Sequence, residues 1–142
     1  GCLAYMSGQP TSASTYFRDS MDIQFSALTD SLYLGNAISG QSISLNISIA
    51  RANIGFIKLV TKDLAVAITA LENALMEQQI LLKGLDDTLV STMDHLALSN
   101  LLVGSQEKAA LVRLKYLFHG MMLTIFIPKY LKFSPFTCCF PR

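Results

Sequence analysis

One apolar repeat, running from Ile43 to Val103, constrains the fold of this chain more than any other feature. Its positions are separated by alternating steps of four and three residues, and none of them carries a charge. A mean spacing of about 3.5 residues places one stripe along one side of a helix, and such a stripe needs another helix to cover it. The repeat therefore predicts a long central helix over residues 42–103. We expect its packing seam to consist of eleven large apolar residues: Ile47, Ile54, Ile57, Leu64, Ile68, Leu71, Leu75, Leu82, Leu85, Leu89 and Leu96.

The low charge of the chain predicts that this helix has neighbours on more than one side. Only 15% of the residues are charged, whereas the outer positions of an exposed coiled coil usually carry many Glu and Lys residues. Apolar residues such as Phe56, Val66 and Leu98 also lie outside the stripe. A lone two-stranded coil would expose them to water. We therefore expect a bundle, or a helical trimer with an outer layer.

Residues 42–49 are ambiguous between a helix and a strand. Ile43, Leu45, Ile47 and Ile49 alternate with polar residues, which is typical of a half-buried strand. The heptad frame, however, begins inside this segment and continues in phase, and no convincing partner strand is nearby. We interpret the segment as helix.

Two shorter helices are predicted to flank the central one, over residues 16–34 and 106–127. Gly104 suits the C-terminus of a helix, and Ser105 suits the start of the next. Residues 1–15 have the composition of a flexible leader, and residues 128–142, with three prolines, that of an irregular hydrophobic tail. The expected fold class is all-α, with one domain over 16–127 that forms a helical hairpin, a bundle or a coiled coil.

Gly84 leaves an alternative open within the central segment. It lies on the outer face of the heptad frame, where glycine weakens a helix by about 1 kcal/mol relative to alanine. It also suits a turn after which Asp86 and Asp87 begin another helix, which would make a hairpin instead of one rod. The orientation of any partner helix is equally open. In an antiparallel pair Arg51 would face Asp86. A parallel trimer is also possible, because it accepts isoleucine at both the a and the d position of the heptad, as at Ile54 and Ile57.

No residue pattern predicts catalysis or a bound cofactor. His95 and His119 are the only histidines, and no further ligands at helical spacing accompany either of them. Phosphate-binding loops, nucleophile elbows and zinc-protease motifs are absent from the sequence. The net charge of +1 gives no reason to expect nucleic acid as a partner. We expect a protein that is not an enzyme and that needs no metal ion.

The C-terminal third supports two interpretations. The apolar run from Tyr116 to Ile127 spans about 18 Å as a helix, short of the roughly 30 Å hydrocarbon core of a bilayer. Residues 111–140 would instead lie at a membrane surface, with basic side chains facing anionic headgroups and with Cys138 and Cys139 as candidates for S-palmitoylation. The alternative is a third helix buried against the bundle.

Residues 43–103 also resemble the first heptad-repeat region of class I viral fusion glycoproteins in their amino-acid composition. The segment is rich in Ile, Leu, Ala, Ser, Thr, Asn and Gln and poor in charge. The resemblance is compositional, and no fusion peptide precedes the segment. It implies a rod-shaped helix whose outer grooves receive a second helix.

We therefore expect a non-enzymatic assembly or tethering module that acts through heptad-mediated helix packing. Its expected partner is a helical protein or a second copy of the chain, as in a homo-oligomer. The alternative function is that of a membrane-acting helical protein, either a peripheral membrane binder or a fusion-type rod. These expectations favour a cytoplasmic or peripheral membrane location.

Overall fold

The described residues of the computed structural model, 1–33, 35, 37–82 and 86–121, form six helices that pack against one another, with no strand among them. The helices are α1 (Cys2–Met6), α2 (Pro10–Tyr33), α3 (Ala37–Val60), α4 (Leu64–Leu81), α5 (Asp87–Leu102) and α6 (Gln106–Met121). The all-α prediction is thus confirmed. Residues 42–49 belong to α3, so the helical interpretation of that segment is also confirmed.

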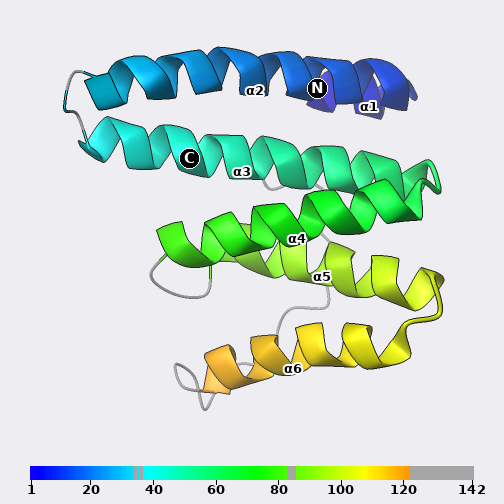
Figure 1. The fold of residues 1–142 in the computed structure, drawn as a ribbon. Helices are drawn as coiled ribbons and strands as arrows, with labels where there is room; N and C mark the ends of the chain where they lie inside the picture. Colours follow the sequence, from blue (N-terminus) through cyan, green and yellow to red (C-terminus); the bar gives the residue numbers. More distant parts are fainter. Residues whose placement is uncertain (34, 36, 83–85, 122–142) are drawn as a thin grey trace.

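The five longer helices form an array in which each packs mainly on its neighbours in the chain. Consecutive helices run in opposite directions from α2 at one end to α6 at the other (Figure 1). Helix α3 packs against both α2 and α4, and α5 packs against α4 and α6. Helix α5 also makes a smaller contact with α3, whereas α2 and α6 do not touch within the described residues.

The prediction of one continuous helix over 42–103 is wrong, because the segment is divided among α3, which begins before it, α4 and α5. The first break follows Val60 and contains neither glycine nor proline. Lys62 takes the left-handed conformation there, with φ of 64°. The amide of Lys62 donates to the carbonyl of Leu59, and the amide of Asp63 donates to that of Lys58. These two bonds form a Schellman motif, which ends a helix by satisfying its last carbonyls.

The second break lies between α4 and α5, and it confirms the alternative of a second helix that begins after Gly84. Helix α5 begins at Asp87, and the carboxylate of Asp86 caps it by accepting a 2.9 Å hydrogen bond from the amide of Thr88. The predicted stop near Gly104 is confirmed as well. Gly104 has a φ of 80°, and the Gly104 and Ser105 amides bond to carbonyls of Leu101 and Asn100 in another Schellman motif.

The predicted leader over 1–15 is wrong, because α1 and the start of α2 lie within it. Gly8, with φ of 74°, ends α1, and Pro10 occupies the first position of α2, where its missing N–H is not needed. Residues of α1, among them Tyr5, pack against the apolar cluster that contains buried Phe17. This tertiary packing outweighs the loose local composition. The predicted helix 16–34 is therefore the longer helix Pro10–Tyr33.

Two apolar clusters form the core. One joins α3, α4 and α5 and consists of Ala52, Leu71, Ala74, Leu75, Leu89, Met93 and Leu96. The other joins α2 to α3, with residues of α1 at its edge, and consists of Ala13, Phe17, Ala50 and Ile57. Helices α3 and α4 approach closely at Gly55, where a Cβ would lie 2.7 Å from the Cγ of Leu71.

Part of α3 is long and apolar enough to cross a membrane. Residues Gly40–Val60 have a mean hydropathy of 1.3, the one such stretch in the described helices. The core helix of a soluble protein has the same properties, and in this structure α3 packs against α2 and α4. Of the predicted helix 106–127, the structure describes α6 to Met121, and the predicted tail 128–142 lies outside the described residues.

Candidate functional site

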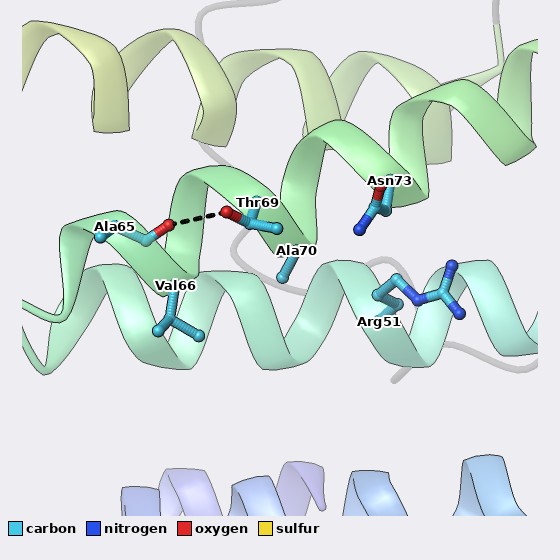
Figure 2. Close-up of a pocket in the computed structure, with 6 residues that line it drawn as sticks. All are labelled: Arg51, Ala65, Val66, Thr69, Ala70 and Asn73. Atoms are coloured by element: carbon cyan, nitrogen blue, oxygen red, sulfur yellow. Dashed lines mark hydrogen bonds between the residues drawn. The ribbon is translucent and has the colours of Figure 1, made fainter.

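A wide groove of about 450 Å³ lies between α3 and α4. Figure 2 shows that Arg51 reaches it from α3 and that the other lining residues come from α4. The hydroxyl of Thr69 is turned to its own helix, where it donates a 3.1 Å hydrogen bond to the carbonyl of Ala65. The remaining lining residues are Val66, Ala70 and Asn73. The groove is open and lined mainly by small apolar groups, so it can receive side chains of a partner but does not gather reactive groups.

Arg51 is held by an ion pair across the α3–α4 contact. Its guanidinium Nη1 donates to Oε1 of Glu77, and both side chains are partly exposed. An ion pair of this exposure contributes roughly 0–1 kcal/mol to stability. The predicted pairing of Arg51 with Asp86 of an antiparallel partner is therefore replaced by a pairing within the chain, because α4 folds back on α3.

Gln78, beside Glu77, is the most unusual polar residue of the core. Its side chain is fully buried, and neither its Oε1 nor its Nε2 has a hydrogen-bond partner among the described residues. A buried unsatisfied amide costs about 1–3 kcal/mol. The sequence signals this residue as a polar member of the heptad stripe, but it does not reveal how deeply it lies.

A row of three rings links α1, α3 and α5. The ring of Phe56 lies between Tyr5, with centroids 5.6 Å apart, and His95, with centroids 4.5 Å apart. Burial lowers the pKa of His95 to about 4, so the imidazole is neutral near pH 7. Burial also raises the pKa of Asp94, although the nearby positive charge of Arg113 opposes the shift.

Among the described residues, these titratable groups do not gather into a metal-binding cluster. No group of three or more His, Cys, Asp or Glu residues is arranged to hold a metal ion within the described part of the chain. The imidazole of His95 packs against the phenyl ring of Phe56. The arrangement explains its neutrality as a consequence of core packing. That the chain is not an enzyme and needs no cofactor remains a prediction.

The residues of the predicted seam are divided between the two core clusters instead of lining one continuous face. Ile57 belongs to the α2–α3 cluster, and Ile54 packs against it. Ile47 is buried and Leu64 is half-buried. The members of the α3–α5 cluster are Leu71, Leu75, Leu89 and Leu96, with Ile68 and Leu82 packed against it. Leu85 lies outside the described residues. Helices of the same chain therefore cover the seam.

Large apolar side chains are exposed on the outer faces of several helices, a feature that the stripe did not predict. Their exposed fractions reach 71% for Ile23 of α2, 80% for Ile80 of α4 and 53% for Leu111 of α6. Further exposed residues are Tyr16, Tyr33, Val66, Met76, Leu98, Leu101, Leu102 and Leu114. The heptad spacing could not reveal them, because it identifies the covered side of each helix. Cys138 and Cys139, the candidates for palmitoylation, lie outside the described residues, as do residues 122–140 of the expected membrane-binding segment.

Comparison of the chain with protein-family models, with characterised proteins and with solved structures finds no match.

Proposed function

We propose that this chain is a non-enzymatic helical assembly module that binds other helices, from a partner protein or from further copies of itself, through the outer faces of its array. One observation supports the proposal above the others, namely the exposure of large apolar side chains such as Ile23, Ile80 and Leu111. Apolar side chains that are exposed on several helices can be covered by contact with another protein or with a membrane.

The interface in this proposal differs from the seam that the heptad repeat predicts. Leu71 and Leu96 are buried between helices of one chain, so they are not available to a partner. A coiled coil formed along that seam would require α3, α4 and α5 to separate. The rod of a fusion glycoprotein would require the same change, because it needs one continuous helix where the structure has three.

Light scattering of the full chain over a hundredfold range of concentration tests the proposal for self-association. The expected result is a mass that rises with concentration. If the mass stays that of one chain, capture by designed helical peptides of heptad sequence provides the second test. Failure to associate in both experiments would contradict an assembly function.

A peripheral membrane binder is the second candidate, and α6 favours it. Leu111 and Leu114 are exposed on this helix, and the basic residues Lys108 and Arg113 are exposed beside them. An amphipathic helix with basic flanks binds anionic bilayers through apolar insertion and charge attraction. Co-sedimentation with vesicles of phosphatidylserine and phosphatidylcholine should then fall in the variant Leu111→Asp. Equal sedimentation of both proteins would argue against this use of α6.

A further inference from the structure

We infer that Cys2 of α1 forms a disulfide with Cys138 or Cys139 of the same chain, so that the two ends of the chain are joined covalently. This modification goes beyond the proposed assembly function and does not depend on it. Cys2 is disulfide-bonded. The chain has three cysteines, and neither of the other two is among the described residues. The partner of Cys2 within the chain is therefore identified by elimination, from the sequence alone.

Covalent geometry disfavours the competing bond between Cys138 and Cys139. Consecutive Cα atoms are about 3.8 Å apart across a trans peptide, whereas the two Cα atoms of a disulfide are usually roughly 4.4–6.8 Å apart. Adjacent cysteines therefore bond more readily to a third, distant cysteine than to each other. In this chain Cys2 is that third cysteine.

Cys2 occupies a defined place on the folded part of the chain. It lies in α1, is half-buried, and packs against the apolar cluster that contains Ala13 and Phe17. Helix α1 in turn packs on α2. The sulfur is therefore held beside the core, and the residue keeps the partial exposure that attack on a small disulfide requires.

The chain beyond α6 is long enough to reach α1. These two helices lie toward opposite ends of the array (Figure 1). Four helix spacings of about 8–10 Å, combined with the length of one helix of 16–18 residues, give a diagonal of roughly 40–48 Å. Residues 122–138 add seventeen residues after α6, which extend to at most about 56–61 Å.

The bond forms through two exchanges with a small disulfide such as glutathione disulfide. The Cys2 thiolate attacks one sulfur of glutathione disulfide, which gives a mixed disulfide and releases one glutathione. The thiolate of Cys138 or Cys139 then attacks the Cys2 sulfur and releases the second glutathione. Two protein thiols are oxidised, one glutathione disulfide is reduced, and the two protons pass to the glutathione thiols. Such bonds persist in oxidising compartments, in contrast to the cytoplasmic location that the sequence favours.

The bond has two consequences for the molecule. It closes a loop that contains all six described helices, and this closure constrains the unfolded chain more than the folded one. It also leaves one thiol in the C-terminal pair of cysteines. The oxidised chain therefore accepts at most one palmitoyl group at that pair, instead of two.

Thiol counting and peptide mapping of the full chain test the inference. The chain is equilibrated with reduced and oxidised glutathione and then alkylated with N-ethylmaleimide in denaturant. The wild type should take up one alkyl group without prior reduction and three after it, since the chain has three cysteines. Trypsin should release peptides 1–18 and 133–142 as a linked pair that separates on reduction. Cys2→Ser is the matched variant, and it should take up two alkyl groups with or without reduction.

Two further measurements test whether the fold brings the two ends together. At one glutathione ratio, the bonded fraction should fall in concentrated urea, because the effective concentration of the two thiols should drop at least about tenfold. Reduction should lower the melting temperature of the wild type by about 10 °C, and it should leave that of Cys2→Ser unchanged.

Other results would overturn the inference in distinguishable ways. Three alkyl groups without reduction would show that no bond forms. An alkylated peptide 1–18 beside an internally bonded peptide 133–142 would show that Cys138 and Cys139 pair with each other. A bond found only in a species of two chains would place it between copies. Equal effective concentrations with and without urea would show that the fold does not bring the ends together. Assembly is tested separately, by light scattering of Cys2→Ser.

Discussion

The imidazole ring of His95 on α5 packs against the phenyl ring of Phe56 on α3, with centroids 4.5 Å apart and planes inclined by 42°. The contact joins two helices that are separated in the chain by the whole of α4. Burial at this contact lowers the pKa of His95 to about 4, from 6.5 in water. Proton binding to this ring is therefore coupled to the integrity of the fold.

We expect the chain to lose stability as the pH falls from about 6.5 to about 4 because of His95. The unfolded chain binds a proton at 6.5 and the folded chain only near 4, so acid favours the unfolded state between these values. The contribution of neutral His95 to the free energy of unfolding is complete above pH 6.5. About 2 kcal/mol of this contribution should be lost between pH 7.5 and pH 5. Urea unfolding at the two pH values measures this loss.

The variant His95→Gln isolates the effect of the histidine. Between pH 7.5 and pH 5, the free energy of unfolding of this variant should lack the loss of about 2 kcal/mol that His95 causes in the wild type, because glutamine does not titrate. The comparison is needed because the pKa of Asp94 is raised by burial, and acid therefore stabilises the fold through that group. Equal pH dependence in both proteins would show that His95 is not buried in its neutral form.

Replacing Lys62 with glycine should stabilise the chain. Lys62 has a φ of 64° at the end of α3, a conformation that costs an L residue about 1 kcal/mol or more and costs glycine almost nothing. We expect Lys62→Gly to raise the free energy of unfolding by about 1 kcal/mol. Lys62→Ala is the control and should leave it nearly unchanged, since alanine keeps the strained conformation. A gain in both variants would mean that the effect comes from lost charge.

Gln78→Leu should also stabilise the fold. It removes two buried polar atoms that have no partner among the described residues, and leucine has a similar volume. The expected gain is about 1–3 kcal/mol in thermal or urea unfolding. Gln79→Leu provides the control, because Gln79 is exposed on the same helix. A loss of stability in Gln78→Leu would show that the amide is satisfied in solution.

Two glycines of α3 should respond in opposite ways to replacement by alanine. A Cβ at Gly55 would lie 2.7 Å from Cγ and 3.3 Å from the backbone nitrogen of Leu71. Gly55→Ala should therefore cost about 1–3 kcal/mol of stability through overpacking. At Gly40 the nearest atom would be 3.7 Å away, so Gly40→Ala should gain up to about 1 kcal/mol from helix propensity. Gains at both positions in urea unfolding would exclude the close approach.

The sequence predicted helices far better than it predicted where they end. Several residues of the apolar repeat, such as Leu71 and Leu96, are buried in the core, and Gly104 marked a helix end that the structure confirms. The break at Lys62 could not be predicted, because no glycine or proline marks it and the heptad frame continues in phase through Leu64. The same heptad spacing is compatible with three packed helices and with one rod, since each helix needs only one covered face.

The polar features of the core were less predictable than its apolar ones. Gln78 stood out as an exception in the stripe, but its complete burial depends on how α4 is packed. The ion pair between Arg51 and Glu77 follows from the fold of α4 back onto α3, and sequence spacing alone does not reveal it. The helical start of the chain depends likewise on the packing of α1, through residues such as Tyr5, against the cluster that contains Phe17.

The distance between spin labels at positions 51 and 77 tests most directly whether the heptad segment is folded back on itself. Cysteine variants at these positions would carry the labels, and an excess of unlabelled chain would restrict the measurement to labels within one molecule. Antiparallel α3 and α4 predict a distance shorter than about 20 Å, because packed helices lie about 8–10 Å apart. One continuous helix would separate the positions by about 39 Å. A distribution centred there would contradict the account.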